Sequence, residues 1–93
     1  MIDGKKITLG GREFIMPPAP FGVVRRFKEV FEGREAADVT KMGDIVFAAL
    51  QRNYPDMSQQ EFEDKYLDLG NIRDAFQAIM GASGAEQAEP GEA

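Results

Sequence analysis

The chain has 93 residues, of which 43% are hydrophobic and 29% charged, and it contains no Cys and no His. This length allows one small domain, since independent domains usually have about 50 to 250 residues. The missing residue types exclude thiol nucleophiles, disulfides, zinc fingers and imidazole acid–base catalysis. We therefore expect a single domain over residues 1–84 that is not an enzyme and has no catalytic, cofactor-binding or metal-binding residues.

Charge is distributed unevenly along the chain, whose net charge is −5. Residues 1–34 contain seven basic and four acidic side chains, whereas residues 35–93 contain four basic and twelve acidic ones. This asymmetry favours oriented docking against a partner or a second copy, so a homo-oligomer is one expectation. The acidic balance and the lack of a basic recognition helix argue against nucleic acid binding. No apolar stretch reaches the roughly 18 residues of a membrane span.

Two short apolar runs near the N-terminus are separated by a Gly-Gly pair. Residues 6–9 and 13–16 flank these glycines, which can adopt the positive φ angles that a tight turn needs. The pattern predicts a β-hairpin over residues 6–16, and its expected core-facing side chains are Ile7, Leu9, Phe14 and Met16. The prolines of residues 17–20 end the second strand, because proline lacks the N–H that a sheet requires.

Apolar residues at helical spacing follow the prolines. They predict helices over about residues 20–32, 39–54, 58–69 and 71–82. Asp38 or Thr40 suits the N-cap of the second helix, and Ser58 with Glu61 matches a capping box at the third. The expected fold class is α+β, mainly α, with an N-terminal β-hairpin followed by about four short α-helices. Residues 85–93 contain no large apolar side chain, which predicts a disordered acidic tail.

The predicted helix over residues 39–54 supplies the candidate binding surface. Phe47 lies to one side of its apolar stripe, which is formed by Met42, Ile45, Val46, Ala49 and Leu50. Aromatic and methionine side chains suit surfaces that accept another helix. We expect Phe47, Leu50, Tyr54 and the neighbouring Met57 to contact a partner. The alternative is core packing, which we favour for the stripe itself, whereas for Phe47 both interpretations stay open.

Two charged clusters are interpreted as ordinary surface. The acidic residues Glu61, Glu63, Asp64 and Asp68 lack the glycine and the alternating oxygen ligands of a calcium loop, so a solvated helix face is the simpler interpretation. The basic residues Arg25, Arg26 and Lys28 are interrupted by Glu29 and Glu32, which weakens any phosphate-binding interpretation. Neither cluster indicates catalysis.

The order of the motifs along the chain resembles a known family. LGGREF at residues 9–14 precedes PPAP at 17–20, followed by DIVFAALQRNYPDMS at 44–58 and AIMGASG at 78–84. The AALQRNYPDMS stretch is the most specific of these. Taken together over residues 2–84, the chain resembles the tail assembly chaperones of long-tailed bacteriophages and prophages.

The resemblance implies a small, non-catalytic helical protein in the host cytoplasm that is absent from the mature virion. Proteins of this family are thought to coat the tape-measure protein, keep it soluble and recruit tail-tube protein as the tail grows. In many relatives a ribosomal frameshift gives a longer second product, which this sequence leaves open. The alternative is a structural tail or head-completion subunit that is retained in the particle.

Overall fold

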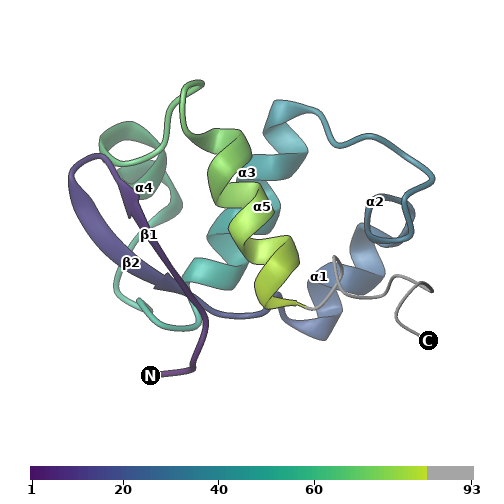
Figure 1. Ribbon diagram of the computed structural model, residues 1–93, viewed down its shortest axis with the longest axis horizontal. Coiled ribbons are helices and arrows are strands. Elements are labelled where there is room, and N and C mark those ends of the chain that lie inside the picture. The colour runs from purple at the N-terminus through teal and green to yellow at the C-terminus, as the bar shows by residue number, and fades with distance from the viewer. Residues whose placement is uncertain (84–93) are drawn as a thin grey trace.

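The computed structural model describes residues 1–83, which form an N-terminal hairpin followed by five helices (Figure 1). The predicted fold class, α+β and mainly α, is confirmed. The predicted tail at residues 85–93 lies outside the described residues, as does Gly84. The elements are β1 (Lys5–Leu9), β2 (Arg12–Met16), α1 (Phe21–Arg26), α2 (Lys28–Phe31), α3 (Val39–Leu50), α4 (Gln59–Lys65) and α5 (Ile72–Ala82).

The hairpin forms as the sequence predicts. β1 and β2 pair antiparallel with Leu9 opposite Arg12, and the turn residues Gly10 and Gly11 have φ angles of 56° and 81°. Three of the four predicted core-facing side chains are buried and Ile7 is half-buried. A Cβ atom on Gly10 would lie 2.7 Å from the carbonyl oxygen of Lys65, so glycine also permits close contact between the turn and the end of α4.

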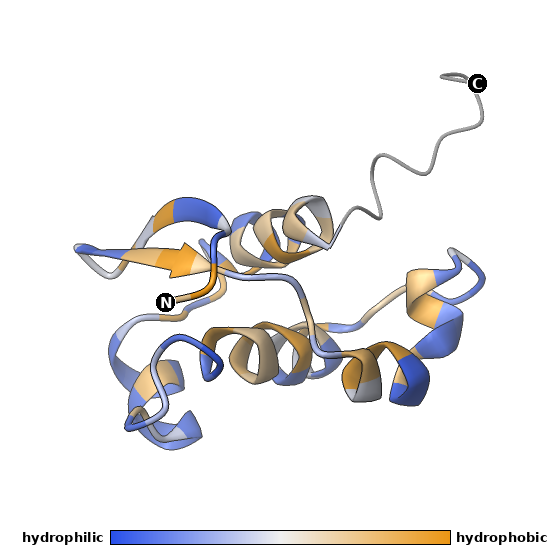
Figure 2. Ribbon diagram, turned by 90° about the horizontal axis from the view of Figure 1, so that it is seen from below, coloured by the Kyte–Doolittle hydropathy of each residue, from blue (hydrophilic) through white to orange (hydrophobic). Residues whose placement is uncertain are grey.

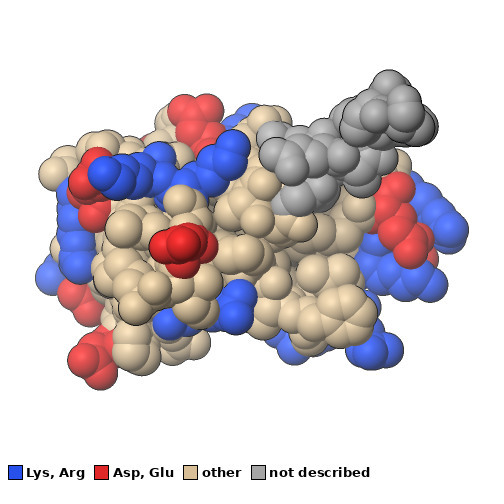
Figure 3. Space-filling view, turned by 60° about the horizontal axis from the view of Figure 1, so that its bottom comes forward, with Lys and Arg blue, Asp and Glu red and all other residues tan. Residues whose placement is uncertain are grey.

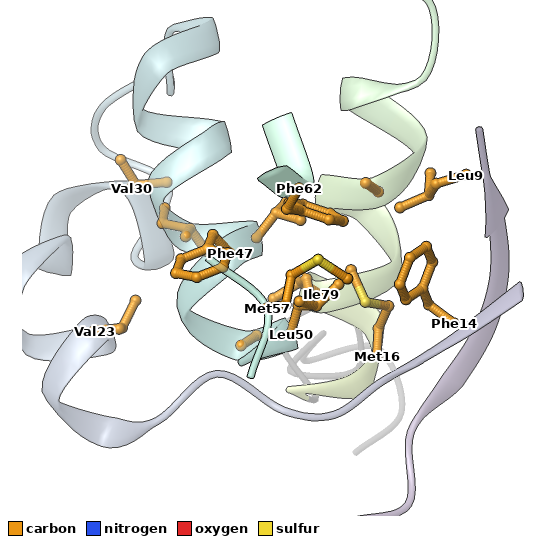
Figure 4. Packing of buried hydrophobic residues seen from close by; sticks show 14 residues of the cluster. Leu9, Phe14, Met16, Val23, Val30, Phe47, Leu50, Met57, Phe62 and Ile79 are labelled. Atoms are coloured by element: carbon orange, nitrogen blue, oxygen red, sulfur yellow. The ribbon is translucent and has the colours of Figure 1, made fainter. Parts of the chain in front are cut away.

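The elements form two layers, with the hairpin and α5 in one and α3, α4 and α1 in the other (Figure 2). Helix α5 crosses α3, and both begin at the upper edge of the view in Figure 1. Side chains from the hairpin, α3, α4 and α5 meet in one core (Figure 4). The fully buried large members include Leu9, Phe14, Met16, Ile45, Leu50, Phe62 and Ile79. The helices thus provide the cover that a lone hairpin needs.

Three predicted helices end or break earlier than their apolar patterns indicate. The predicted helix over residues 20–32 is two helices, because Phe27 adopts φ −113° and ψ 38°, outside helical geometry. Helix α3 ends at Leu50, and the chain continues in short turns in which the N–H groups of Asn53 and Tyr54 donate to the Leu50 carbonyl. Helix α4 ends at Lys65 rather than residue 69.

Side chains that follow α3 fasten the N-terminal segment to the helical body. Asn53, only 9% exposed, accepts a hydrogen bond from the Ile2 N–H at 2.7 Å and donates to the carbonyls of Ile2 and Ile15. The Tyr54 hydroxyl accepts from the Ile15 N–H at 2.9 Å. Arg52 donates to the Pro18 carbonyl at 2.7 Å. These contacts satisfy backbone groups at the sheet edge and at the proline segment, where no ladder partner exists.

Candidate protein-binding surface

Three of the four predicted contact residues, two on α3 and one after it, lie in the core. Phe47 is 9% exposed, Leu50 is 0% exposed and Met57 is 7% exposed (Figure 4). The ring of Phe62 on α4 lies 6.2 Å from that of Phe47, centroid to centroid, so α4 covers this flank within the same chain. The expectation of an uncovered flank on α3 is therefore wrong for these three residues. The core alternative is the one that the structure shows.

Tyr54, the fourth predicted contact residue, is half-buried in an aromatic cluster. The rings of Tyr54 and Tyr66 meet the ring of Phe14 edge to face, with centroids 5.3 and 5.2 Å away. The guanidinium of Arg12 lies 4.8 to 5.6 Å from the centroids of these three rings, within cation–π range. Arg12 therefore covers the outer side of this cluster.

A hollow of about 370 Å³ lies beside this aromatic cluster and includes two predicted contact residues, Tyr54 and Met57. Its other lining residues are Arg12, Asn53, Pro55, Asp56 and Glu61. Charged and amide groups predominate in that set. The hollow therefore does not provide the apolar contact surface that the sequence predicted here.

The exposed apolar side chains lie elsewhere. Leu69 is 76% exposed, Phe21 69% and Val39 39%, and Met1 and Ile2 are exposed near the N-terminus. Both Leu69 and Phe21 fall within helices that the sequence predicts, over residues 58–69 and 20–32. Leu69 falls outside α4 because that helix ends at Lys65, and Phe21 belongs to a helix that breaks at Phe27. A helical stripe predicts burial only while the helix continues.

An apolar groove contains two of these exposed residues. It has a volume of about 260 Å³ and lies between the first turn of α3, the loop before α5 and the start of α5. Its uncharged lining residues are Val39, Thr40, Gly43, Leu67, Leu69 and Ile72, and its charged ones are Glu63 and Asp68. Both α3 and the loop before α5 reach the upper edge of Figure 1 at this point. We call this site the Leu69 groove.

Side-chain hydrogen bonds hold the loop that carries Leu69. A carboxylate oxygen of Asp68 accepts from the N–H groups of Gly70 and Asn71 at 2.8 and 2.9 Å. The Asn71 side chain accepts from the Asp68 N–H at 2.8 Å and donates to the Tyr66 carbonyl at 2.9 Å. The loop is thus fixed by its own polar groups while Leu69 points to solvent. A preorganised apolar side chain loses little freedom when a partner covers it.

The first turn of α3 is fixed in a similar way. Asp38 is the N-cap and accepts hydrogen bonds from the Lys41 N–H at 2.9 Å and from the Thr40 hydroxyl at 2.7 Å. These bonds lower the pKa of Asp38, with the backbone bond from Lys41 as the largest cause. The hydrogen bond to Glu35 raises the pKa of Lys41. Val39 therefore stands on a capped helix end.

Phe21 forms a second, separate apolar site on α1. The Arg25 guanidinium lies 5.2 Å from the centroid of its ring, and Arg26 is exposed beside it. Helix α1 lies at the lower side of Figure 1, opposite the Leu69 groove. Figure 3 brings that lower side forward and shows charged side chains gathered towards the two ends, with a mostly uncharged middle. The exposed apolar residues are therefore split between two sides of the molecule.

The acidic helix face behaves as ordinary surface in the contacts that it makes. Glu61 pairs with Lys65 at 3.7 Å, and the Glu63 carboxylate accepts from Gln59 at 2.9 Å. Within residues 1–83, no group of three or more acidic side chains is arranged to hold a metal ion. None of the helices in this part of the chain combines the length and apolar character needed to cross a bilayer.

Comparison with known proteins gave no match: no family model, no curated protein and no solved structure is similar to this chain. One local feature of the sequence indicates that Leu69 lies in a loop and not in a helix. It follows an Asp and precedes a glycine, a combination typical of loops.

Proposed function

We propose that this protein is a tail assembly chaperone of a long-tailed phage or prophage. In this proposal it acts in the host cytoplasm without catalysis, binds the tape-measure protein, keeps it soluble and helps to recruit tail-tube protein. It is then absent from the mature virion. The motif order is the basis for proposing this family, and the Leu69 groove is the observation that best supports a binding role.

The Leu69 groove supports the proposal because it is an apolar site that residues 1–83 leave exposed, although these residues form a well-packed core. Burying an exposed Leu side chain contributes roughly 1.5 to 3 kcal/mol. While Leu69 is exposed on its loop, this burial free energy does not stabilise the domain. A protein that binds apolar helices of another chain would gain that free energy on binding.

The size of the groove agrees with reversible binding. Eight residues line it, whereas stable interfaces use about 20 to 30 residues on each side. One such contact is weak, so a long client is retained when many copies bind along it. Weak individual contacts also allow release when tail-tube subunits replace the chaperone.

Co-expression with the tape-measure protein encoded in the same genome tests the function. We expect the soluble fraction of the tape-measure protein to rise several-fold with the wild-type chain and much less with Leu69→Ser. Phe21→Ser is the matched control, because it removes an equally exposed apolar side chain from the other side of the molecule. A client that stays equally insoluble with and without the wild-type chain would contradict the proposal.

Mass spectrometry of purified particles tests the predicted absence from the virion. A transient chaperone leaves no peptides at a level comparable with tail subunits. Peptides of this chain in stoichiometric amounts would instead identify a structural tail or head-completion subunit.

A further inference from the structure

The charged residues of the Leu69 groove are all acidic. Glu63 and Asp68 line it, and within residues 1–83 neither forms an ion pair. Gln59 donates hydrogen bonds to both Asp44 and Glu63, at 3.0 and 2.9 Å, which places a third carboxylate next to the groove. The groove thus combines apolar walls with excess negative charge.

Basic side chains of the neighbouring helices do not neutralise this charge. Lys41 is bonded to Glu35, and Lys65 is paired with Glu61 at 3.7 Å. Arg73, at the start of α5, is exposed, and within residues 1–83 it forms no ion pair with the acids of the groove. No Lys or Arg of the described chain lines the groove. An occupant that brings its own cations beside apolar side chains therefore complements the site, whereas an acidic one is repelled.

We infer that the Leu69 groove takes a short amphipathic segment of the client in which Lys or Arg residues flank the apolar ones. This inference rests on the proposed function and adds the chemistry of the client segment. Leu69 and Val39 contact the apolar side chains, and Glu63 faces the cations. Asp68 contributes charge but is also engaged in the loop, so Glu63 is the residue to test.

A client segment fits this groove better than a second copy does. Within residues 1–83, two short segments combine exposed apolar side chains with bases outside any ion pair: Phe21 with Arg25 and Arg26 on α1, and Met1 and Ile2 with Lys5 and Lys6 at the N-terminal end. A contact between six-residue α1 and an eight-residue groove is far smaller than a stable protein–protein interface. A flexible client needs only a few anchor side chains at each site.

Fluorescence anisotropy with two synthetic peptides tests the inference. Both are amphipathic helices of about four turns with the same Leu face, one carrying Lys and the other Glu on its polar face. We expect the Lys peptide to bind about tenfold more tightly than the Glu peptide, with the difference shrinking as salt rises. Leu69→Ser should weaken the Lys peptide about tenfold, because the lost Leu burial corresponds to at least that factor.

Two further variants separate the contribution of the groove's charge from that of an exposed apolar residue elsewhere. Glu63→Gln should weaken the Lys peptide about threefold and reduce its salt dependence, while leaving the Glu peptide unchanged or slightly tighter. Phe21→Ser should bind both peptides as the wild type does. Circular dichroism melting confirms that each variant is folded, which we expect because all three side chains are exposed.

Each other outcome overturns a defined part of the inference. Equal binding of the two peptides excludes charge selection, and loss of binding in Phe21→Ser but not Leu69→Ser places the site on α1. A lower mass of Leu69→Ser than of wild type in light scattering assigns the groove to a second copy. If neither peptide binds while the tape-measure protein is still kept soluble, the groove inference fails and the function stands. If the Lys peptide binds but the tape-measure protein stays insoluble, the groove inference stands and the proposed function fails.

Discussion

Phe62 and Leu69 lie close together in the chain and are both large and apolar, yet Phe62 is fully buried and Leu69 is 76% exposed. The difference comes from the end of α4 at Lys65, which lies between them. Before that point, the helix directs Phe62 onto Phe14 and Phe47, with centroids 5.8 and 6.2 Å away. After it, hydrogen bonds of Asp68 and Asn71 set the loop and leave Leu69 in solvent.

This comparison separates two uses of apolar side chains in one small protein. The core around Phe62 stabilises the fold, because each buried side chain is removed from water and closely packed. Leu69 contributes little to the fold, because its side chain is 76% exposed. Four experiments with substituted chains test this separation.

Phe62→Ala should have the largest effect. Removing a fully buried Phe leaves a cavity and should lower the free energy of unfolding by about 3 to 5 kcal/mol. Leu69→Ala should change it by less than about 0.5 kcal/mol, because that side chain already contacts water. Urea denaturation measures both. Similar losses for the two variants would break the comparison.

Gly10→Ala should come next, because it disturbs the contact between the hairpin turn and the end of α4. The new Cβ would meet the Lys65 carbonyl at 2.7 Å and would also occupy a positive-φ position. Together these should lower the free energy of unfolding by about 2 to 3 kcal/mol.

Gly11→Ala is the matched control in the same turn, since its φ is +81° but nothing lies within 4 Å of its Cβ. Gly11→Ala should therefore lower the free energy of unfolding only through the strained backbone, by about 1 kcal/mol. Thermal unfolding of both variants shows whether close approach adds to the backbone cost. Equal melting temperatures would mean that the turn moves freely away from α4.

Ser58→Ala should cost about 1 kcal/mol, because the Ser58 hydroxyl caps α4 by accepting from the Glu61 N–H at 3.0 Å. The cap stabilises the helix that carries Phe62 and leads to the Leu69 loop. Its loss should therefore affect both the core around Phe62 and the loop that carries Leu69. Ser58→Asp restores a capping oxygen and should recover most of the loss in urea denaturation. A failure of Asp to recover it would indicate that the hydroxyl has another role.

Asp38→Asn should have the smallest effect and should show it only in acid. The pKa of Asp38 lies below its ordinary value of 3.8 in the folded chain. The stabilisation from ionised Asp38 is therefore complete above that value and is lost as the pH falls through the lower folded pKa. Asn caps equally well without titrating. The urea midpoint of the variant should match wild type near neutral pH and fall less between about pH 5 and pH 2.

Much of the fold follows from local sequence patterns. The Gly-Gly pair, the prolines after Met16 and the capping residues Asp38 and Ser58 each act on neighbouring backbone atoms. They therefore predicted the hairpin and the helix starts correctly. The ends of the helices were predicted less well. Phe27 interrupts the first helix without any proline or glycine at that position, and nothing local distinguishes it from the apolar residues around it.

The candidate binding residues show the limit of such patterns most clearly. Phe47 lies off the main stripe of α3, and its position on the helix is equally consistent with an outer surface or with a second layer of core. Its burial depends on α4 packing against it, which is a contact between segments far apart in the chain. In our proposal the apolar binding site is therefore the Leu69 groove, in place of Phe47, Leu50, Tyr54 and Met57.

The sequence by itself determined the fold class, the hairpin turn, two helix caps and the net acidic charge, because each depends on residue type and on neighbours along the backbone. Only the tertiary structure decided which apolar side chains are covered, since burial is a property of contacts between distant segments. Helix α4 covers Phe47 and ends before Leu69. The same short helix therefore closes the surface that the sequence predicted and leaves open the groove that it did not.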